Sequence, residues 1–315
     1  MIDENQPLKK GERTVAVLRF PVPSEWDGKP LGQLLRTVYG VSGTTLKKAK
    51  RIDGGITQDG MHIRTVDPVR AGAEIRVAVD AEKRVYQPVS AEVPVLFEDE
   101  SFVAFDKPAG LVVHPSRGHP YDTLANVFAG RAETAGLVFR PLDRLDRDTT
   151  GIVLAAKNAH VATNTVLTRK RYAAILAGVP EEAEFVIDAP IAREGKDTQK
   201  RCIRPDGQAA RTRCRVIKTE NGFALAAFAL ETGRTHQIRV HAASIGCPLL
   251  GDPLYGTSSE LIGRQALHCA LLAFRHPMTG EELTLFSPIP DDFAKAAAAL
   301  GFGGVRALLE GNNML

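Results

Sequence analysis

The stretch RLDRDTTGIVLAA, residues 144–156, sets a charged turn directly against an apolar strand. Three aspartates and three arginines are crowded into residues 140–151, RPLDRLDRDTTG. An exposed helix can also mix charges, but there they recur at three- and four-residue spacing. The crowding indicates a loop that positions one carboxylate, Asp146, whose ionised form the neighbouring arginines favour. By itself such an Arg–Asp pair is more often structural than functional.

Short apolar strands separated by turns continue on both sides of this stretch. Examples are VLFEDESFVAFDKP (95–108), RYAAILAG (171–178), RTRCRVIKT (211–219) and FALAAFAL (223–230). Helical character is confined mainly to residues 123–129, 159–167 and 291–300. The pattern predicts an α+β domain with a mixed, mostly antiparallel sheet.

Residues 28–80 form a small α/β unit in front of this domain. Apolar residues at helical spacing over 31–38 predict a short amphipathic helix, and Ser42 can cap a second one. A hairpin through Asp59-Gly60 and a strand over 74–79 follow. The basic residues of the second helix are Lys47, Lys48, Lys50 and Arg51. The unit resembles the alpha-L type of RNA-binding module; the alternative is a helical extension whose basic residues are merely exposed.

Composition excludes several classes of protein. A chain with 44% hydrophobic and 24% charged residues is typical of a globular protein. Its longest apolar runs, such as ALLAF at 270–274, are far shorter than the roughly 20 residues that cross a bilayer. The N-terminus lacks the apolar core of a signal peptide, so we expect a cytoplasmic protein. The four cysteines form no CxxC pair, and we expect neither zinc nor disulfides.

Positive charge gathers in the middle of the chain. Residues 131–171 carry eight Lys or Arg against four acidic residues, and residues 193–215 carry eight against three. Nucleic acid is the natural partner of such a surface, although a solvated protein surface can carry the same charges.

A second cluster of polar residues, GRTHQIRVHAASIGCPLLGDPLYG, spans residues 233–256. If residues 235–240 form a strand, Gln237 and Arg239 share one face. Arg239 can then make a two-point pair with a carboxylate brought from elsewhere in the fold. His236 and His241 have no neighbouring metal ligands, and we expect them to bond phosphate or backbone instead.

Three motifs together resemble the RluA-type RNA pseudouridine synthases. They are VLFEDESFVAFDKPAGLVVHPS (95–116), RLDRDTTG (144–151), and GRTHQIRVH (233–241) with GDPLYG (251–256). The resemblance implies isomerisation of uridine to pseudouridine in structured RNA, ribosomal RNA rather than transfer RNA, without metal or other cofactor. The implied organisation is an N-terminal extension (1–27), the alpha-L-type module (28–80), a linker (81–90), the catalytic domain (91–302) and a C-terminal tail (303–315).

The resemblance also assigns roles to single residues. Asp146 matches the family's essential aspartate, which attacks the ribose or removes a proton from it, and Arg239 matches its arginine partner. Tyr172 matches the tyrosine that stacks on the target base, Leu267 an apolar position beneath the uracil, and Arg144 an RNA contact. Further expected substrate contacts are Lys107, Gln237 and Arg234. Asp143 stands where many members carry His or Asn, and we expect it to add negative charge near phosphate.

Two other classes of function compete with this interpretation. A non-catalytic RNA-binding protein would use the basic module, but it has no need of Asp146, Tyr172 and Arg239 together. A hydrolase would pair Asp146 with Asp148 or Asp143, yet a chain with a single Trp lacks an aromatic platform for sugars. We therefore favour the synthase, and we expect it to be a monomer because no oligomerisation segment stands out.

Overall fold

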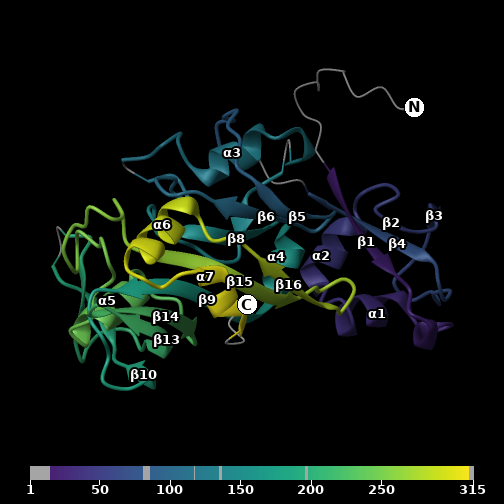
Figure 1. Cartoon of the computed structure of the whole chain (residues 1–315). Coiled ribbons are helices and arrows are strands. Elements are labelled where there is room, and N and C mark those ends of the chain that lie inside the picture. The colour runs from purple at the N-terminus through teal and green to yellow at the C-terminus, as the bar shows by residue number, and fades with distance from the viewer. Residues whose placement is uncertain (1–14, 81–85, 117, 135–136, 196–197, 312–315) are drawn as a thin grey trace.

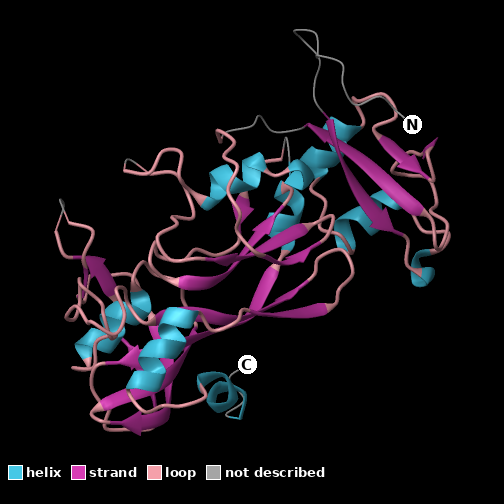
Figure 2. Ribbon diagram, turned by 45° about the horizontal axis from the view of Figure 1, so that its top comes forward, coloured by secondary structure: helices cyan, strands magenta, loops and turns pink. Residues whose placement is uncertain are grey.

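The computed structural model describes residues 15–80, 86–116, 118–134, 137–195 and 198–311, and these form two packed units (Figure 1). The N-terminal unit lies at one end of the molecule, and the larger unit extends from it around a long sheet (Figure 2). The units touch where the Phe20 ring meets the edge of the His160 ring, with centroids 5.5 Å apart.

The N-terminal unit packs short helices on a four-stranded antiparallel sheet of order β1-β4-β2-β3. Its elements are β1 (Val15–Pro21), η1 (Ser24–Trp26), α1 (Leu31–Thr37), α2 (Gly43–Ala49), β2 (Ile56–Gln58), β3 (Met61–His62) and β4 (Glu74–Asp80). The expected helices, hairpin and strand are all present. Ser42 caps α2 by accepting a hydrogen bond from the Thr45 amide at 3.0 Å.

One expected boundary of this unit differs from the structure. Residues 1–27 were assigned to an extension, but β1 pairs along its whole length with β4. Leu18 and Phe20 of β1 are buried in the same core as Leu31 and Leu34 of α1. The unit therefore includes β1, because the apolar faces of α1 and β4 need this strand to complete their core.

The larger unit is built on a ten-stranded sheet, whose main path runs β10-β13-β14-β9-β15-β8-β6-β5. Its strands are β5 (Val95–Glu98), β6 (Phe102–Lys107), β7 (Arg140–Pro141), β8 (Thr150–Ala156), β9 (Val166–Leu176), β10 (Glu184–Asp188), β13 (Arg211–Glu220), β14 (Phe223–Leu230), β15 (Leu267–Arg275) and β16 (Glu282–Phe286). A separate hairpin joins β11 (Ile191–Arg193) to β12 (Arg201–Ile203). Of the pairings described, β8 with β15 is parallel and the others are antiparallel, which confirms the α+β, mostly antiparallel prediction.

Helices cover the sheet unevenly. They are α3 (Leu124–Gly130), η2 (Ala132–Thr134), α4 (Ala159–Asn164), α5 (Gln237–Ser244), α6 (Asp291–Ala299) and α7 (Val305–Gly311). On β9, Ala173 and Ile175 pack into the core under α6 and α7, whereas Tyr172 and Ala174 face the larger core on the other side. Alternation along a strand thus separates a covered structural face from the face that carries Tyr172.

Three secondary-structure predictions were wrong in part. The expected strand over 235–240 is the beginning of α5, in which Ile238 and Ala242 enter the main core one helical turn apart. The expected helix over 159–167 ends at Asn164, because Val166 and Leu167 pair with β15. The expected tail after 303 contains α7, which buries Val305 and Leu309.

Gly151 explains why the charged stretch ends in glycine. Its φ of 110° is strained for any residue with a side chain, and an added Cβ would lie 2.2 Å from the Cys269 carbonyl oxygen. The parallel pairing of Gly151 with Cys269 therefore requires this residue. In the part of the chain that the structure describes, no helix is long and apolar enough to cross a membrane.

Candidate active site

The loop between β7 and β8 holds Asp146 in a fixed position. Its backbone turns through a hydrogen bond from the Thr149 amide to the Asp146 carbonyl at 3.1 Å. Lys107 donates to the Arg147 carbonyl at 2.8 Å, and Arg264 donates to the Asp148 carbonyl at 3.2 Å. The side chain of Asp146 is 25% exposed, so a rigid loop presents a carboxylate to the outside.

Lys107 supports this loop rather than a substrate. Its side chain is fully buried, and its ammonium group also donates to the carbonyls of Pro108 and Leu111, at 2.7 and 2.8 Å. Burial lowers its pKa to about 7, although the carboxylate of Asp148 acts in the opposite direction. The three carbonyls use all three N–H donors, so the expected substrate contact by Lys107 is replaced by a positioning role.

Arg239 links Asp146 to a second carboxylate. It donates to Asp146 at 3.1 Å through Nη1, and to both oxygens of Asp252 at 2.7 and 2.8 Å. The two-point pair expected for Arg239 is therefore made with Asp252, and the contact with Asp146 uses a third N–H. Burial opposes ionisation of Asp252, but its hydrogen bonds from Arg239 outweigh that cost and lower its pKa.

His236 and Tyr255 form a third contact to Asp146. The Arg201 amide donates to the Tyr255 hydroxyl at 2.7 Å, and that hydroxyl lies 2.8 Å from His236 Nδ1. His236 Nε2 lies 3.8 Å from the Asp146 carboxylate, which can only accept, so Nε2 carries the proton and Tyr255 donates to Nδ1. Burial and the nearby arginines lower the pKa of His236, which keeps its ring neutral. His236 has φ 58°, a strained conformation for this residue.

Tyr172 lies beside a buried ion pair between Lys170 and Asp143. Lys170 Nζ is 5.2 Å from the centre of the Tyr172 ring and is bonded to Asp143. Asp143 also accepts from the Leu154 amide at 3.0 Å, and its side chain is 5% exposed. The expectation that Asp143 adds charge near phosphate is therefore wrong, because Lys170 neutralises it inside the protein.

The phenol of Tyr172 is held in its neutral form. Burial raises its pKa above the usual range, and the positive charge of Lys170 only partly offsets this. At neutral pH the hydroxyl is therefore a hydrogen-bond donor beside the ring face.

These side chains surround one cavity of about 970 Å³. Of the predicted site residues, those that line it are Asp146, Tyr172, Arg239, Arg144, Leu267, Gln237 and Arg234. Arg144 and Arg234 are exposed, whereas Gln237 is buried. The Gln237 amide is fully engaged: it accepts from Thr232 and Arg234 and donates to Arg211 and Thr212. Gln237 therefore shapes the wall from within rather than offering free donors.

The predicted residues outside this cavity are Lys107 and the module residues Lys47, Lys48, Lys50 and Arg51. All four module residues are exposed. Asp148 does not line the cavity either; it pairs with Arg147 at 2.9 Å. Asp143 is neutralised by Lys170, so a pair of free carboxylates of the kind a hydrolase needs is not assembled around Asp146.

Sequence reasoning missed four residues that complete the site. Asp252 and Tyr255 lie in GDPLYG, a motif whose position was recognised without a role for either side chain. His236 was expected to meet phosphate or backbone, and Lys170 was counted only as surface charge. The adjacency of GDPLYG to GRTHQIRVH was the available signal for Asp252 and Tyr255.

The arrangement suits chemistry by one carboxylate. Asp146 can attack an electrophilic carbon or accept a proton, while Arg239 balances its charge. Tyr172 and Leu267 offer an aromatic and an apolar surface to a planar ring, and the exposed arginines surround the cavity with positive charge. Among the described residues, no group of three or more His, Cys, Asp or Glu is placed to hold a metal ion.

Comparison with known proteins agrees with this geometry. Residues 101–244 match the RNA pseudouridylate synthase family. The chain is 36% identical over 295 residues to ribosomal large subunit pseudouridine synthase D of Pseudomonas aeruginosa, covering 86% of this chain and 92% of that protein. It is 38% identical to an uncharacterised RNA pseudouridine synthase of Bacillus subtilis, covering 81% of this chain and 94% of the relative. The structure resembles human RNA pseudouridylate synthase domain containing 4, with TM-score 0.51 and 26% identity over 66% of this chain and 92% of that one.

Proposed function

The chain belongs to the RNA pseudouridine synthase family and is an RNA pseudouridine synthase, and from that premise we propose that it modifies uridines in ribosomal RNA. Relatives from Pseudomonas aeruginosa and Xanthomonas campestris are both named ribosomal large subunit pseudouridine synthase D. The expectations of a cytoplasmic, monomeric enzyme that needs no cofactor remain part of this proposal.

In the proposed mechanism, Asp146 acts on the ribose of a nucleotide that has left its helix. The bond between C1′ and N1 of uracil breaks, the base turns, and a bond forms between C1′ and C5. The C5 proton is then lost and N1 gains a proton, so the reaction is an isomerisation. Asp146 serves either by attacking C1′ or by taking a proton from the sugar, and Arg239 holds it in place. The nucleotide must leave the stack because Asp146 lies inside a cavity.

The contact between Asp146 and Arg239 inside this cavity is the observation on which the proposal rests. The test is to map pseudouridines in ribosomal and transfer RNA from cells with and without the gene. We expect at least one pseudouridine of large-subunit ribosomal RNA to disappear and to return when the gene is restored. Loss confined to transfer RNA would contradict the ribosomal assignment.

Tyr172→Phe should separate stacking from proton transfer. The phenyl ring keeps the aromatic face and the contact with Lys170, so RNA affinity should be unchanged. Loss of the hydroxyl should slow conversion by roughly 100-fold if it transfers a proton. Because burial raises the pKa of Tyr172, wild-type conversion should show no alkaline loss from this group near neutral pH.

Single-turnover conversion of large-subunit ribosomal RNA from cells lacking the protein provides the measurement. Tyr121→Phe is the matched control, because Tyr121 is exposed and does not line the cavity. Equal single-turnover rates for Tyr172→Phe and the wild type would leave the tyrosine a stacking role alone.

The alpha-L-type unit is proposed to bind RNA away from the reacting nucleotide. Figure 1 shows α2 and α5 toward opposite ends of the molecule, so a large structured RNA is needed to reach both. Replacing all four exposed basic residues (Lys47, Lys48, Lys50 and Arg51) by Gln should weaken RNA binding. It should also lower the salt dependence by about 0.7–0.9 per lost phosphate contact.

Binding at several salt concentrations measures this effect. Arg64 and Arg70 are the controls within the same unit, because Asp67 and Asp59 already pair with them. Their replacement by Gln should change binding much less. A fourfold variant that binds and modifies RNA as well as the wild type at physiological salt would refute an RNA-binding role for α2.

A further inference from the structure

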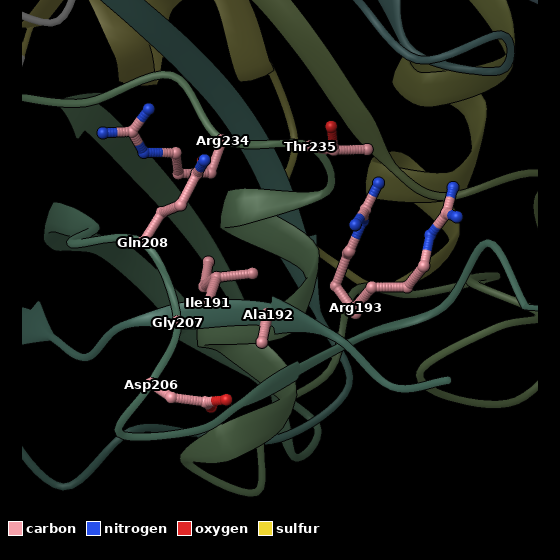
Figure 3. A pocket seen from close by; sticks show the side chains of 9 residues that line it. Ile191, Ala192, Arg193, Asp206, Gly207, Gln208, Arg234 and Thr235 are labelled. Atoms are coloured by element: carbon pink, nitrogen blue, oxygen red, sulfur yellow. The ribbon is translucent and has the colours of Figure 1, made fainter. Parts of the chain in front are cut away.

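A second cavity of about 360 Å³ lies beside the catalytic one (Figure 3). The β11–β12 hairpin, the turn that follows it and the segment before α5 surround it. Its lining residues are Ile191, Ala192, Arg193, Arg201, Asp206, Gly207, Gln208, Arg234 and Thr235. Arg234 and Thr235 also line the catalytic cavity, so the two spaces share a wall.

Arg201 brings an unused donor to this pocket. Its Nε is buried and has no hydrogen-bond partner, and none of the described carboxylates forms an ion pair with its guanidinium. A buried donor left unbonded costs about 1–3 kcal/mol, and native proteins rarely tolerate one without a reason. The backbone amide of Arg201 is fixed by the Tyr255 hydroxyl, so this side chain starts from a rigid point beside the active site.

The charge in the pocket is positive on the side of the catalytic cavity. Figure 3 shows Arg193 extending toward Thr235, with Asp206 at the opposite end. Asp206 is paired with Arg204, which does not line the pocket, so its charge is balanced from outside. Arg201 is near enough to His236 for its charge to disfavour protonation of that ring. Arginines and a hydroxyl therefore converge on a space next to Asp146.

We propose that this pocket binds a phosphate group of the RNA strand next to the nucleotide undergoing reaction. The inference rests on the proposed function, since it takes RNA as the substrate. Guanidinium groups match phosphate oxygens in both charge and geometry, and such an anion would satisfy Arg201 Nε. A strand whose sugar meets Asp146 must pass the shared wall at Arg234 and Thr235, which places an adjacent phosphodiester within the pocket.

Arg201→Gln in the full-length protein provides the test. Large-subunit ribosomal RNA from cells lacking the protein is the probe. We expect affinity to fall about tenfold, as for one charged hydrogen-bonded contact. The slope of log affinity against log salt should fall by about 0.7. At saturating RNA the single-turnover rate should approach that of the wild type. The melting temperature without RNA should not fall, because the substitution removes an unbonded buried donor.

Arg204→Gln is the matched control, from the same turn but outside the pocket, and it should bind RNA like the wild type. Arg201→Lys covers the case of a misfolded Arg201→Gln: it keeps the charge, so the salt slope should stay while affinity falls less. If the wild type converts ribosomal RNA and Arg201→Gln has unchanged affinity and slope, the phosphate inference fails alone. If the wild type neither binds nor converts it, the proposed function fails.

Inorganic phosphate distinguishes a free anion from an RNA phosphate. Should it raise the melting temperature of the wild type but not of Arg201→Gln, with RNA affinity equal in both proteins, the pocket is a site for free anions. That result would overturn the RNA assignment. Competition between inorganic phosphate and RNA in the wild type, absent in Arg201→Gln, would support it.

Discussion

Asp146→Asn is expected to abolish pseudouridine formation while RNA binding persists. The amide has nearly the shape of the carboxylate, and the loop is fixed by backbone contacts to Lys107 and Arg264 that the substitution does not touch. An amide can neither attack C1′ nor accept a proton from the sugar. We expect conversion to slow on the order of 10⁴-fold or more, the scale seen when a reacting group is removed from an enzyme.

The measurement is conversion of ribosomal RNA from cells lacking the protein, with affinity determined separately. Asp148→Asn is the matched control from the same loop, because Asp148 pairs with Arg147 and does not line the cavity. It should retain most of the activity. Appreciable conversion by a folded Asp146→Asn variant would contradict the mechanism, whereas normal binding without conversion by any form of the protein would favour a binding-only function.

Arg239→Met is expected to remove nearly as much activity and to destabilise the fold. Arg239 is 6% exposed, and its removal leaves Asp252, whose side chain is fully buried, without a guanidinium. Breaking one partner of a buried ion pair typically costs about 3–5 kcal/mol. Asp146 also loses its charge partner beside a partly dry cavity, so its carboxylate is less well placed to react. The melting temperature and the single-turnover rate should therefore both fall.

A double variant separates these two effects. Arg239→Met combined with Asp252→Asn removes the unpaired buried carboxylate and should recover much of the lost stability. The backbone amides of Leu254 and Tyr255, which donate to the Asp252 carboxylate, can still donate to the side-chain oxygen of the introduced asparagine. Conversion should stay low, because Asp146 still lacks Arg239. If the double variant regained both stability and near wild-type conversion, the contact between Arg239 and Asp146 would be dispensable for the reaction.

Local pattern was a good guide wherever a single element carries its own signals. Ser42, the helical spacing over 31–38 and the Asp59-Gly60 turn act through neighbours in the sequence, and the predicted elements formed there. Residues 235–240 failed because their alternation suits a strand as well as one buried turn of helix. The burial of Ile238 and Ala242 in the main core selects the helix, and no local signal contains that information.

The same limit applies to the candidate site. Motif resemblance named Asp146 and Arg239, and the fold brings them to 3.1 Å although 93 residues separate them. It misjudged Lys107 and Asp143, because a charged side chain looks the same in sequence whether it meets substrate, carbonyl oxygens or a buried lysine. Their partners, Arg147 and Lys170, lie 40 and 27 residues away.

The sequence by itself thus determined the α+β class, the N-terminal helices and the residues that carry chemistry, since each depends on local periodicity or on a contiguous motif. Only the tertiary structure decided that Asp252 holds Arg239, that Lys170 neutralises Asp143 and that Arg201 leaves a buried donor unbonded beside the catalytic cavity. Those outcomes depend on burial and on charges brought together by strand pairing, and electrostatic energy in a protein is set by distance and solvent exposure rather than by order along the chain.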